Sequence, residues 1–168
     1  MKARVSIIMG STSDLPVMEK AARVLEEFQV PFELIALSAH RTPSEVEAFA
    51  TSARDRGIEV IIAGAGMAAA LPGVIAAQTT LPVIGVPIAA SLDGMDALLS
   101  IVQMPPGIPV ATVGIGAAQN AGLLALQIMA TADTTLATRL AAYKAGLKQK
   151  IVHANEQLHN VTGYQFLV

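Results

Sequence analysis

The sequence has no cysteine, few aromatic residues and few charges. Of its 168 residues, 4% are aromatic and 14% are charged. The lack of cysteine excludes disulfides and a zinc–thiolate site and suits a reducing compartment, so we expect a cytoplasmic protein. Eleven Lys and Arg residues against 13 Asp and Glu residues give a net charge of −2. This balance argues against a general affinity for nucleic acid or for anionic membranes.

The scarcity of charge indicates an assembled protein. Globular domains usually carry about 25% charged residues, so a monomer of this composition would expose much apolar surface. Residues 60–92 and 97–132 contain no charge at all. Proline and glycine divide both stretches, and neither holds the ~20 uninterrupted apolar residues of a membrane-spanning helix. We therefore expect a homo-oligomer without membrane association, in which these stretches face other subunits. The first residues also lack the apolar region and cleavage site of a signal peptide.

Short apolar runs alternate with helical patterns along residues 1–132, which we expect to form an α/β domain. Hydrophobic residues at helical spacing lie between runs of strand length. The runs are nearly continuous in apolar residues, which is typical of strands covered on both faces. They occur at residues 4–9, 32–37, 60–63, 82–86 and 110–113. Repeated βα units of this kind predict a central parallel sheet with helices on both faces.

The pattern changes in residues 133–168. From Leu136 to Leu158, apolar residues recur at helical spacing and are separated by lysine and arginine. This segment is predicted to be a long amphipathic helix that extends the same domain. We expect it to pack against the domain or a neighbouring subunit, with His153 and His159 as solvated or packing residues.

Ligands of open parallel sheets bind beyond the carboxyl ends of the strands, and unusual polar residues occur there in this sequence. The first predicted strand is followed by Gly10-Ser11-Thr12-Ser13-Asp14 and then by a helix that starts near Pro16. Asp14 or Ser13 can cap that helix and do nothing more. Alternatively, free backbone N–H groups and two hydroxyls form an anion cradle at the positive end of the helix.

The second predicted strand is followed by the segment SAHRTPSE at residues 38–45. Thr42 and Glu45 fit a capping box with Pro43 at the first helical position, which places His40 and Arg41 in the loop before the helix. The histidine can be a hydrogen-bonded loop residue and the arginine a solvated charge. Next to a hydroxyl-rich anion cradle, however, the pair suits phosphate binding and proton transfer.

The third predicted strand is followed by Gly64-Ala65-Gly66-Met67-Ala68-Ala69, which formally matches the dinucleotide fingerprint G-x-G-x-x-A. The match is weak, because it lies on the third βα unit and no acidic residue follows at the required ~20 residues. The glycines are better explained by close approach of a substrate to the backbone. No cluster has metal-ligand spacing, and no nucleophile–base–acid set is evident.

Four segments together resemble the PurE family of purine biosynthesis. They are residues 10–14, 38–43, 64–66 and 100–105, and the motifs SAHRTP and SIVQMP are especially specific. The resemblance covers about residues 4–132 in the same order. It implies a flavodoxin-like three-layer sandwich, an octamer with sites at subunit contacts, a small ribonucleotide substrate, and neither cofactor nor metal. The implied reaction converts N5-carboxyaminoimidazole ribonucleotide to 4-carboxy-5-aminoimidazole ribonucleotide, the mutase reaction of the bacterial class.

The resemblance also implies roles for individual residues. Ser11 and Arg41 would hold the ribose 5′-phosphate, Asp14 would accept hydrogen bonds from the ribose hydroxyls, and His40 would be the general acid/base. The other residues of the expected substrate site are Ser13, Ser38, Gly64, Gly66 and Leu71.

The sequence departs from the usual bacterial pattern GAGGAAHLPG at two positions. Ala70 stands where the bacterial pattern usually has its second histidine, and Met67 stands where it usually has a glycine. These changes affect how the protein holds the carboxylate that migrates in the reaction. They also bear on whether the substrate is the N-carboxylated ribonucleotide or aminoimidazole ribonucleotide. One alternative is therefore an aminoimidazole ribonucleotide carboxylase that uses free CO2.

Two further alternatives come from other functional classes. A non-catalytic nucleotide- or phosphosugar-binding module would keep Ser11, Asp14 and Arg41 but have no need of His40. An NAD-dependent enzyme using the Gly64 loop is weakened by the missing ribose-binding acid.

Overall fold

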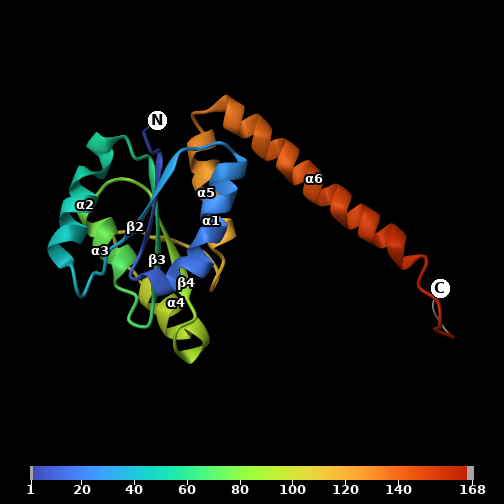
Figure 1. The fold of residues 1–168 in the computed structure, drawn as a ribbon, viewed down its shortest axis with the longest axis horizontal. Coiled ribbons are helices and arrows are strands. Elements are labelled where there is room, and N and C mark those ends of the chain that lie inside the picture. Colours follow the sequence, from blue (N-terminus) through green and yellow to red (C-terminus); the bar gives the residue numbers. More distant parts are fainter. Residues whose placement is uncertain (1, 166–168) are drawn as a thin grey trace.

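Apolar side chains fill both faces of the central strands in the computed structural model, which describes residues 2–165 (Figure 1). Every residue of β1 (Val5–Met9) and β4 (Val83–Ile88) is buried, as are all but the last residue of β3 (Val60–Gly66). The sheet is completed by β2 (Phe32–Ala36) and by the two-residue strand β5 (Ala111–Thr112). All pairings are parallel, in the order β2-β1-β3-β4-β5. This is the flavodoxin-like order, so the predicted parallel α/β sandwich is confirmed.

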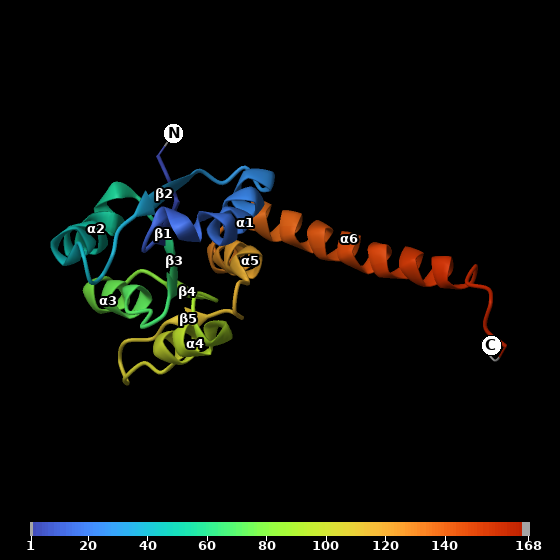
Figure 2. The ribbon, with the colours of Figure 1, turned by 60° about the horizontal axis from the view of Figure 1, so that its bottom comes forward.

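Helices form a layer on each face of the sheet (Figure 2). One face is covered by α1 (Leu15–Glu27) and α5 (Ala118–Ala130), whose buried side chains include Met18, Leu25 and Leu126. The other face is covered by α2 (Pro43–Arg56), α3 (Leu71–Gln78) and α4 (Met95–Val102). Short 3₁₀ turns, η1 (Thr12–Asp14) and η2 (Leu92–Gly94), precede α1 and α4.

Close packing between helices and sheet explains why this chain needs few aromatic residues. An ideal Cβ on Gly85 of β4 would lie within 3.1 Å of Val110 and closer still to Ile101, which is fully buried. A Cβ on Gly64 of β3 would overlap the buried Met18 in the same way. Aliphatic side chains of the helices therefore fill the space that glycines leave on the strands.

The long helix α6 (Thr134–Leu158) leaves the sandwich after its first turns (Figure 1). Leu136 and Leu140 are buried, and Tyr143 packs edge-on against Phe28 with 5.7 Å between ring centroids. Beyond this point the apolar residues are exposed, and Ile151 reaches 72% exposure. Only the first part of the predicted apolar stripe thus packs against its own domain. None of the helices in residues 2–165 combines the length and hydropathy needed to cross a bilayer.

Asp133 anchors the start of α6. Its Oδ1 accepts hydrogen bonds from the N–H groups of Thr135 and Leu136, both at 3.1 Å, and its Oδ2 lies 3.4 Å from Arg4 Nη1. Arg4 also pairs with Glu59, at 2.6 Å between Nε and Oε1. The Leu136 N–H group and the Arg4 guanidinium lower the pKa of Asp133 from its ordinary value of 3.8.

We predict that Asp133→Ala lowers the Tm by a few degrees at pH 7, because two N–H groups of α6 lose their acceptor. The charged carboxylate stabilises the folded state fully above pH 3.8, and this contribution is lost as the pH falls through the lower pKa of the folded protein. Thermal unfolding should therefore show a Tm difference between wild type and variant that narrows in strong acid. Asp133→Asn, which keeps an acceptor for the cap, should lose less. Equal Tm values for Asp133→Ala and wild type at pH 7 would contradict this role.

Candidate functional site

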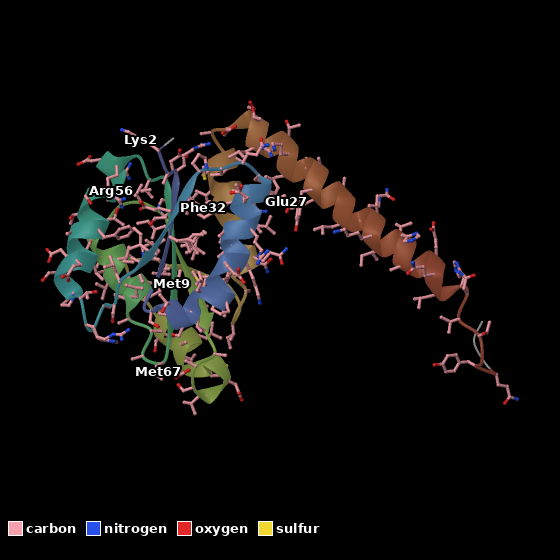
Figure 3. All side chains as sticks on the ribbon, in the orientation of Figure 1. Lys2, Met9, Glu27, Phe32, Arg56 and Met67 are labelled. Atoms are coloured by element: carbon pink, nitrogen blue, oxygen red, sulfur yellow. The ribbon has the colours of Figure 1, made fainter. Side chains whose placement is uncertain are left out.

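A cavity of about 500 Å³ lies at the carboxyl ends of β1, β2, β3 and β4, and we call it the carboxyl-end cavity. Figure 3 shows Met67, one of its lining residues, at the opposite end of the sandwich from Lys2 and Arg56. The order β2-β1-β3 reverses direction at β1, and open parallel sheets bind ligands at such a switch point. The loops carrying the predicted site residues therefore meet where this fold has its natural crevice.

The loop after β1 is a network of short polar side chains. Ser11 has extended backbone and caps η1, its Oγ accepting a hydrogen bond from Ser13 N–H at 3.1 Å. The Ser11 and Ser13 hydroxyls lie 2.6 Å apart, and Ser13 Oγ is 3.4 Å from Asp14 Oδ1. The expectation that Asp14 or Ser13 caps α1 is wrong. The 3₁₀ turn η1 comes before α1 and is capped by Ser11, and the Asp14 side chain makes no capping hydrogen bond to α1. The three side chains instead face the cavity.

The loop after β2 is closed by Thr42. Its Oγ1 accepts a hydrogen bond from Ser38 N–H at 2.9 Å and donates to the Ser38 carbonyl at 3.1 Å. The predicted capping box is therefore wrong: Thr42 stands at the N-cap of α2, but its hydroxyl turns back to Ser38 and makes no bond to the helix. This closed turn carries exposed His40 and Arg41 at its tip.

Arg41 ties the first two loops together. Its Nη2 donates to the Gly10 carbonyl at 2.8 Å, and its Nε lies 3.3 Å from Ser38 Oγ. The guanidinium thus lies over the hydroxyl-rich loop, and its other N–H groups stay available to an anion. A phosphate in the cavity would meet a guanidinium and two serine hydroxyls together.

The loop after β3 is tight and apolar. Ala69 N–H donates to the Gly66 carbonyl at 3.0 Å, and both Met67 and Ala69 have positive φ, at 54° and 38°. Gly66 is pressed against the β4 loop, since a Cβ there would lie 2.9 Å from the Cβ of Ala90. This close approach requires glycine.

The structure brings together all but one of the predicted site residues. The carboxyl-end cavity is lined by Ser11, Ser13, Asp14, Ser38, His40, Arg41, Gly66 and Leu71. Gly64 is outside this lining and faces Met18 in the core, so close packing against α1 explains its lack of a side chain. The sequence pattern could not separate the two glycines, because they lie two residues apart on the same face of β3. Only their positions along the strand differ, with Gly64 under α1 and Gly66 beside the loop after β4.

Sequence reasoning missed Ala90, which follows β4 and lines the cavity. Its position directly after a buried strand could have identified it, but an alanine side chain has no functional group that suggests a role in a site. The SIVQMP motif does not line the cavity. Within this chain, Ile101 is buried against Gly85, and Met104 lies against Gly73.

A larger cavity of about 700 Å³ lies at the amino-terminal ends of β4 and β5. Its charged lining residues are Arg54 and Asp55, and Arg54 Nη2 already donates to Thr80 Oγ1 at 2.9 Å. The carboxyl-end cavity is smaller but combines a carboxylate, an imidazole and a guanidinium with several hydroxyls. It can bind an anion and move a proton, so we identify it as the candidate active site.

The family model for AIR carboxylase matches residues 4–150. The chain belongs to the AIR carboxylase family. Among its relatives, the N5-carboxyaminoimidazole ribonucleotide mutase of Pyrococcus abyssi is 59% identical over 147 residues, which is 87% of this chain and 84% of the relative. The mutase of the same name from Bacillus subtilis is 55% identical, over 94% of this chain and 99% of the relative. The crystal structure of Treponema denticola PurE2-S38D matches with a TM-score of 0.85 and 30% identity, over 94% of this chain and 99% of that one. This AIR carboxylase family membership confirms the resemblance that the four sequence motifs carry.

We predict that Arg41→Ala weakens binding of ribose 5-phosphate by about 10- to 100-fold, the loss expected for a charge-assisted hydrogen bond. Folding should change little, since the side chain is exposed. Titration calorimetry and thermal unfolding measure the two effects. Arg23→Ala, which removes an exposed arginine paired only with Glu19 on α1, is the matched control. Wild-type affinity in Arg41→Ala would show that the phosphate binds elsewhere.

Proposed function

We propose that this chain converts N5-carboxyaminoimidazole ribonucleotide to 4-carboxy-5-aminoimidazole ribonucleotide in de novo purine biosynthesis. The observation that carries the proposal is the meeting of His40 and Arg41 with the Ser11–Asp14 loop in one cavity. It is supported by relatives of 55% and 59% identity that bear the mutase name and align over most of their length.

The polar loops suit the ribose phosphate. Arg41 and the Ser11 and Ser13 hydroxyls can bind the 5′-phosphate. Asp14, next along the loop, accepts hydrogen bonds from the ribose hydroxyls. With the sugar held there, the imidazole ring extends toward His40 and the apolar loop after β3.

The reaction then needs one proton-carrying group. The bond between the exocyclic nitrogen and its carboxylate breaks, CO2 leaves, and the electron pair stays on nitrogen, which takes a proton from His40. Carbon 4 of the ring attacks the CO2, and His40 removes the proton from that carbon to restore aromaticity. Histidine suits both steps, because it gains and loses protons readily near neutral pH.

A second candidate is carboxylation of aminoimidazole ribonucleotide with free CO2. It is favoured by Ala70, because in this chain the loop after β3 offers no ionisable side chain to bind the carboxylate of an N-carboxylated substrate. Backbone N–H groups and His40 remain as partners for that carboxylate. Losing one hydrogen bond should cost about 1–3 kcal/mol, which slows a reaction without changing its type.

The deciding experiment compares two routes at matched enzyme concentration. One assay supplies the N-carboxylated ribonucleotide, and the other supplies aminoimidazole ribonucleotide with excess bicarbonate and CO2. We expect efficient product formation in the first assay. Efficient product formation in the second assay alone would identify a carboxylase that uses CO2. If neither assay gives product, the alternative of a non-catalytic nucleotide- or phosphosugar-binding module is favoured.

We predict that His40→Asn binds the ribonucleotide but turns over at least ~100-fold more slowly, the low end for loss of an acid/base group. The loop should keep its shape, since Thr42 and Arg41 close it without help from the imidazole. Product formation and calorimetric binding are the two measurements. His153→Asn, which changes an exposed histidine on α6, controls for general effects. An active His40→Asn variant would mean that another group moves the proton.

We propose that the chain assembles into a homo-octamer. Large apolar side chains are exposed on η2 and α4, including Leu92 at 76% and Leu99 at 50%, and α6 exposes more of them. Such patches on one chain mark surfaces that other chains cover. The patches indicate assembly, and the resemblance to the PurE family implies eight chains. Light scattering should then give eight times the mass of the 17.4 kDa chain. A stable monomer at micromolar concentration would contradict this proposal.

A further inference from the structure

The carboxyl-end cavity has a polar half and an apolar half. The loops after β1 and β2 supply every hydroxyl, carboxylate, imidazole and guanidinium of its lining. The loops after β3 and β4 supply no polar side chain at all. Their lining residues are Ala65, Gly66, Met67, Ala68, Ala69, Ala70, Leu71 and Ala90. Met67 is the longest side chain of this apolar half.

The backbone fixes Met67 in place. Its φ of 54° is in the left-handed region, which costs free energy for a residue with a side chain. The turn is held on both sides, since Ala69 is only 3% exposed and bonds to the Gly66 carbonyl, and Gly66 is wedged against Ala90. Strained residues that the surroundings hold in place are characteristic of ligand-contacting sites.

The side chain of Met67 stands at the mouth of the cavity. It is 60% exposed and nevertheless belongs to the cavity lining, and Figure 3 shows it at the outer end of the sandwich. A methionine has an unbranched, flexible and polarisable side chain that adapts its shape to a ligand. It can therefore fold over a ligand that fills the apolar half.

We propose that Met67 covers the apolar half of the cavity and retains the CO2 that is released and recaptured within one turnover. This inference rests on the function proposed above. Between cleavage of the nitrogen–carbon bond and formation of the carbon–carbon bond, the CO2 is uncharged. An uncharged molecule forms no salt bridge, and the apolar half of the cavity, which includes Ala70, offers the CO2 no polar side chain either. A side chain that covers the cavity is then needed to keep the CO2 close to carbon 4 of the ring. Without it the CO2 escapes into water, where it becomes bicarbonate.

The test measures how often CO2 escapes. Wild type and Met67→Ala are supplied with unlabelled N5-carboxyaminoimidazole ribonucleotide in buffer containing ¹³C-bicarbonate and carbonic anhydrase. Label in the product and release of free aminoimidazole ribonucleotide both report escape. We expect both to rise about threefold or more in Met67→Ala, since an open site permits the side reaction. Consumption of substrate should stay within about twofold of wild type, since the acid/base group is untouched.

Two further variants make the result specific. Met67→Leu keeps an apolar side chain of similar volume and should restore retention. Leu34→Ala removes an exposed apolar side chain on β2 that neither lines the cavity nor belongs to the apolar surfaces of η2, α4 and α6, and should behave as wild type. Unchanged label incorporation in Met67→Ala would overturn the proposal. A smaller particle mass for Met67→Ala in light scattering would also overturn it, because Met67 would then be an interface residue. A wild-type enzyme that does not consume the N-carboxylated substrate at all would instead overturn the proposed function.

Discussion

The burial of both faces of the parallel sheet is the constraint on which the rest of the structure depends. Every position of β1 and β4 is apolar or small except Ser6, and helices cover both sides. The backbone N–H and C=O groups of these strands are paired along the sheet, so the sheet interior has no room for polar chemistry. Reactive side chains can then stand only beyond the strand ends. The parallel arrangement brings the carboxyl ends of four strands to one place, and the cavity follows from that.

Arg41 turns this shared position into a defined site. Strand pairing sets the distance between the loops after β1 and β2, but it does not fix the loops themselves. The hydrogen bond from the Arg41 guanidinium to the Gly10 carbonyl does so at 2.8 Å, and the Thr42–Ser38 bonds hold the turn that carries it. The same arginine therefore holds the two loops together and, in the proposed function, provides the charge that binds the phosphate. Its two hydrogen bonds restrict the side chain before any ligand arrives, which lowers the entropy that binding must overcome.

The long-range pattern of hydrophobicity predicted the fold, and the polar residues after the first two strands predicted most of the candidate site. These signals work because burial and strand direction act over whole elements. Details that depend on the direction of one side chain were not predictable. Thr42 fits a capping box by spacing, yet its hydroxyl bonds to Ser38 because the preceding turn brings that backbone closer. Gly64 looked equivalent to Gly66 until the sheet placed one against Met18 and the other against Ala90.

The uneven distribution of charge along the chain has a structural meaning that composition alone could not supply. Residues 60–92 carry no charge and, by composition, are candidates for a membrane segment until proline and glycine are considered. In the structure they form β3, α3 and β4 together with the entire apolar half of the cavity. The charged and hydroxyl-bearing half comes from the first 41 residues. The sheet order β2-β1-β3-β4 sets these two parts of the sequence side by side at the switch point. One wall of the cavity thus suits a phosphate, and the other suits uncharged CO2. The reason is that a charged stretch and an uncharged stretch of the sequence meet at the carboxyl edge of the sheet.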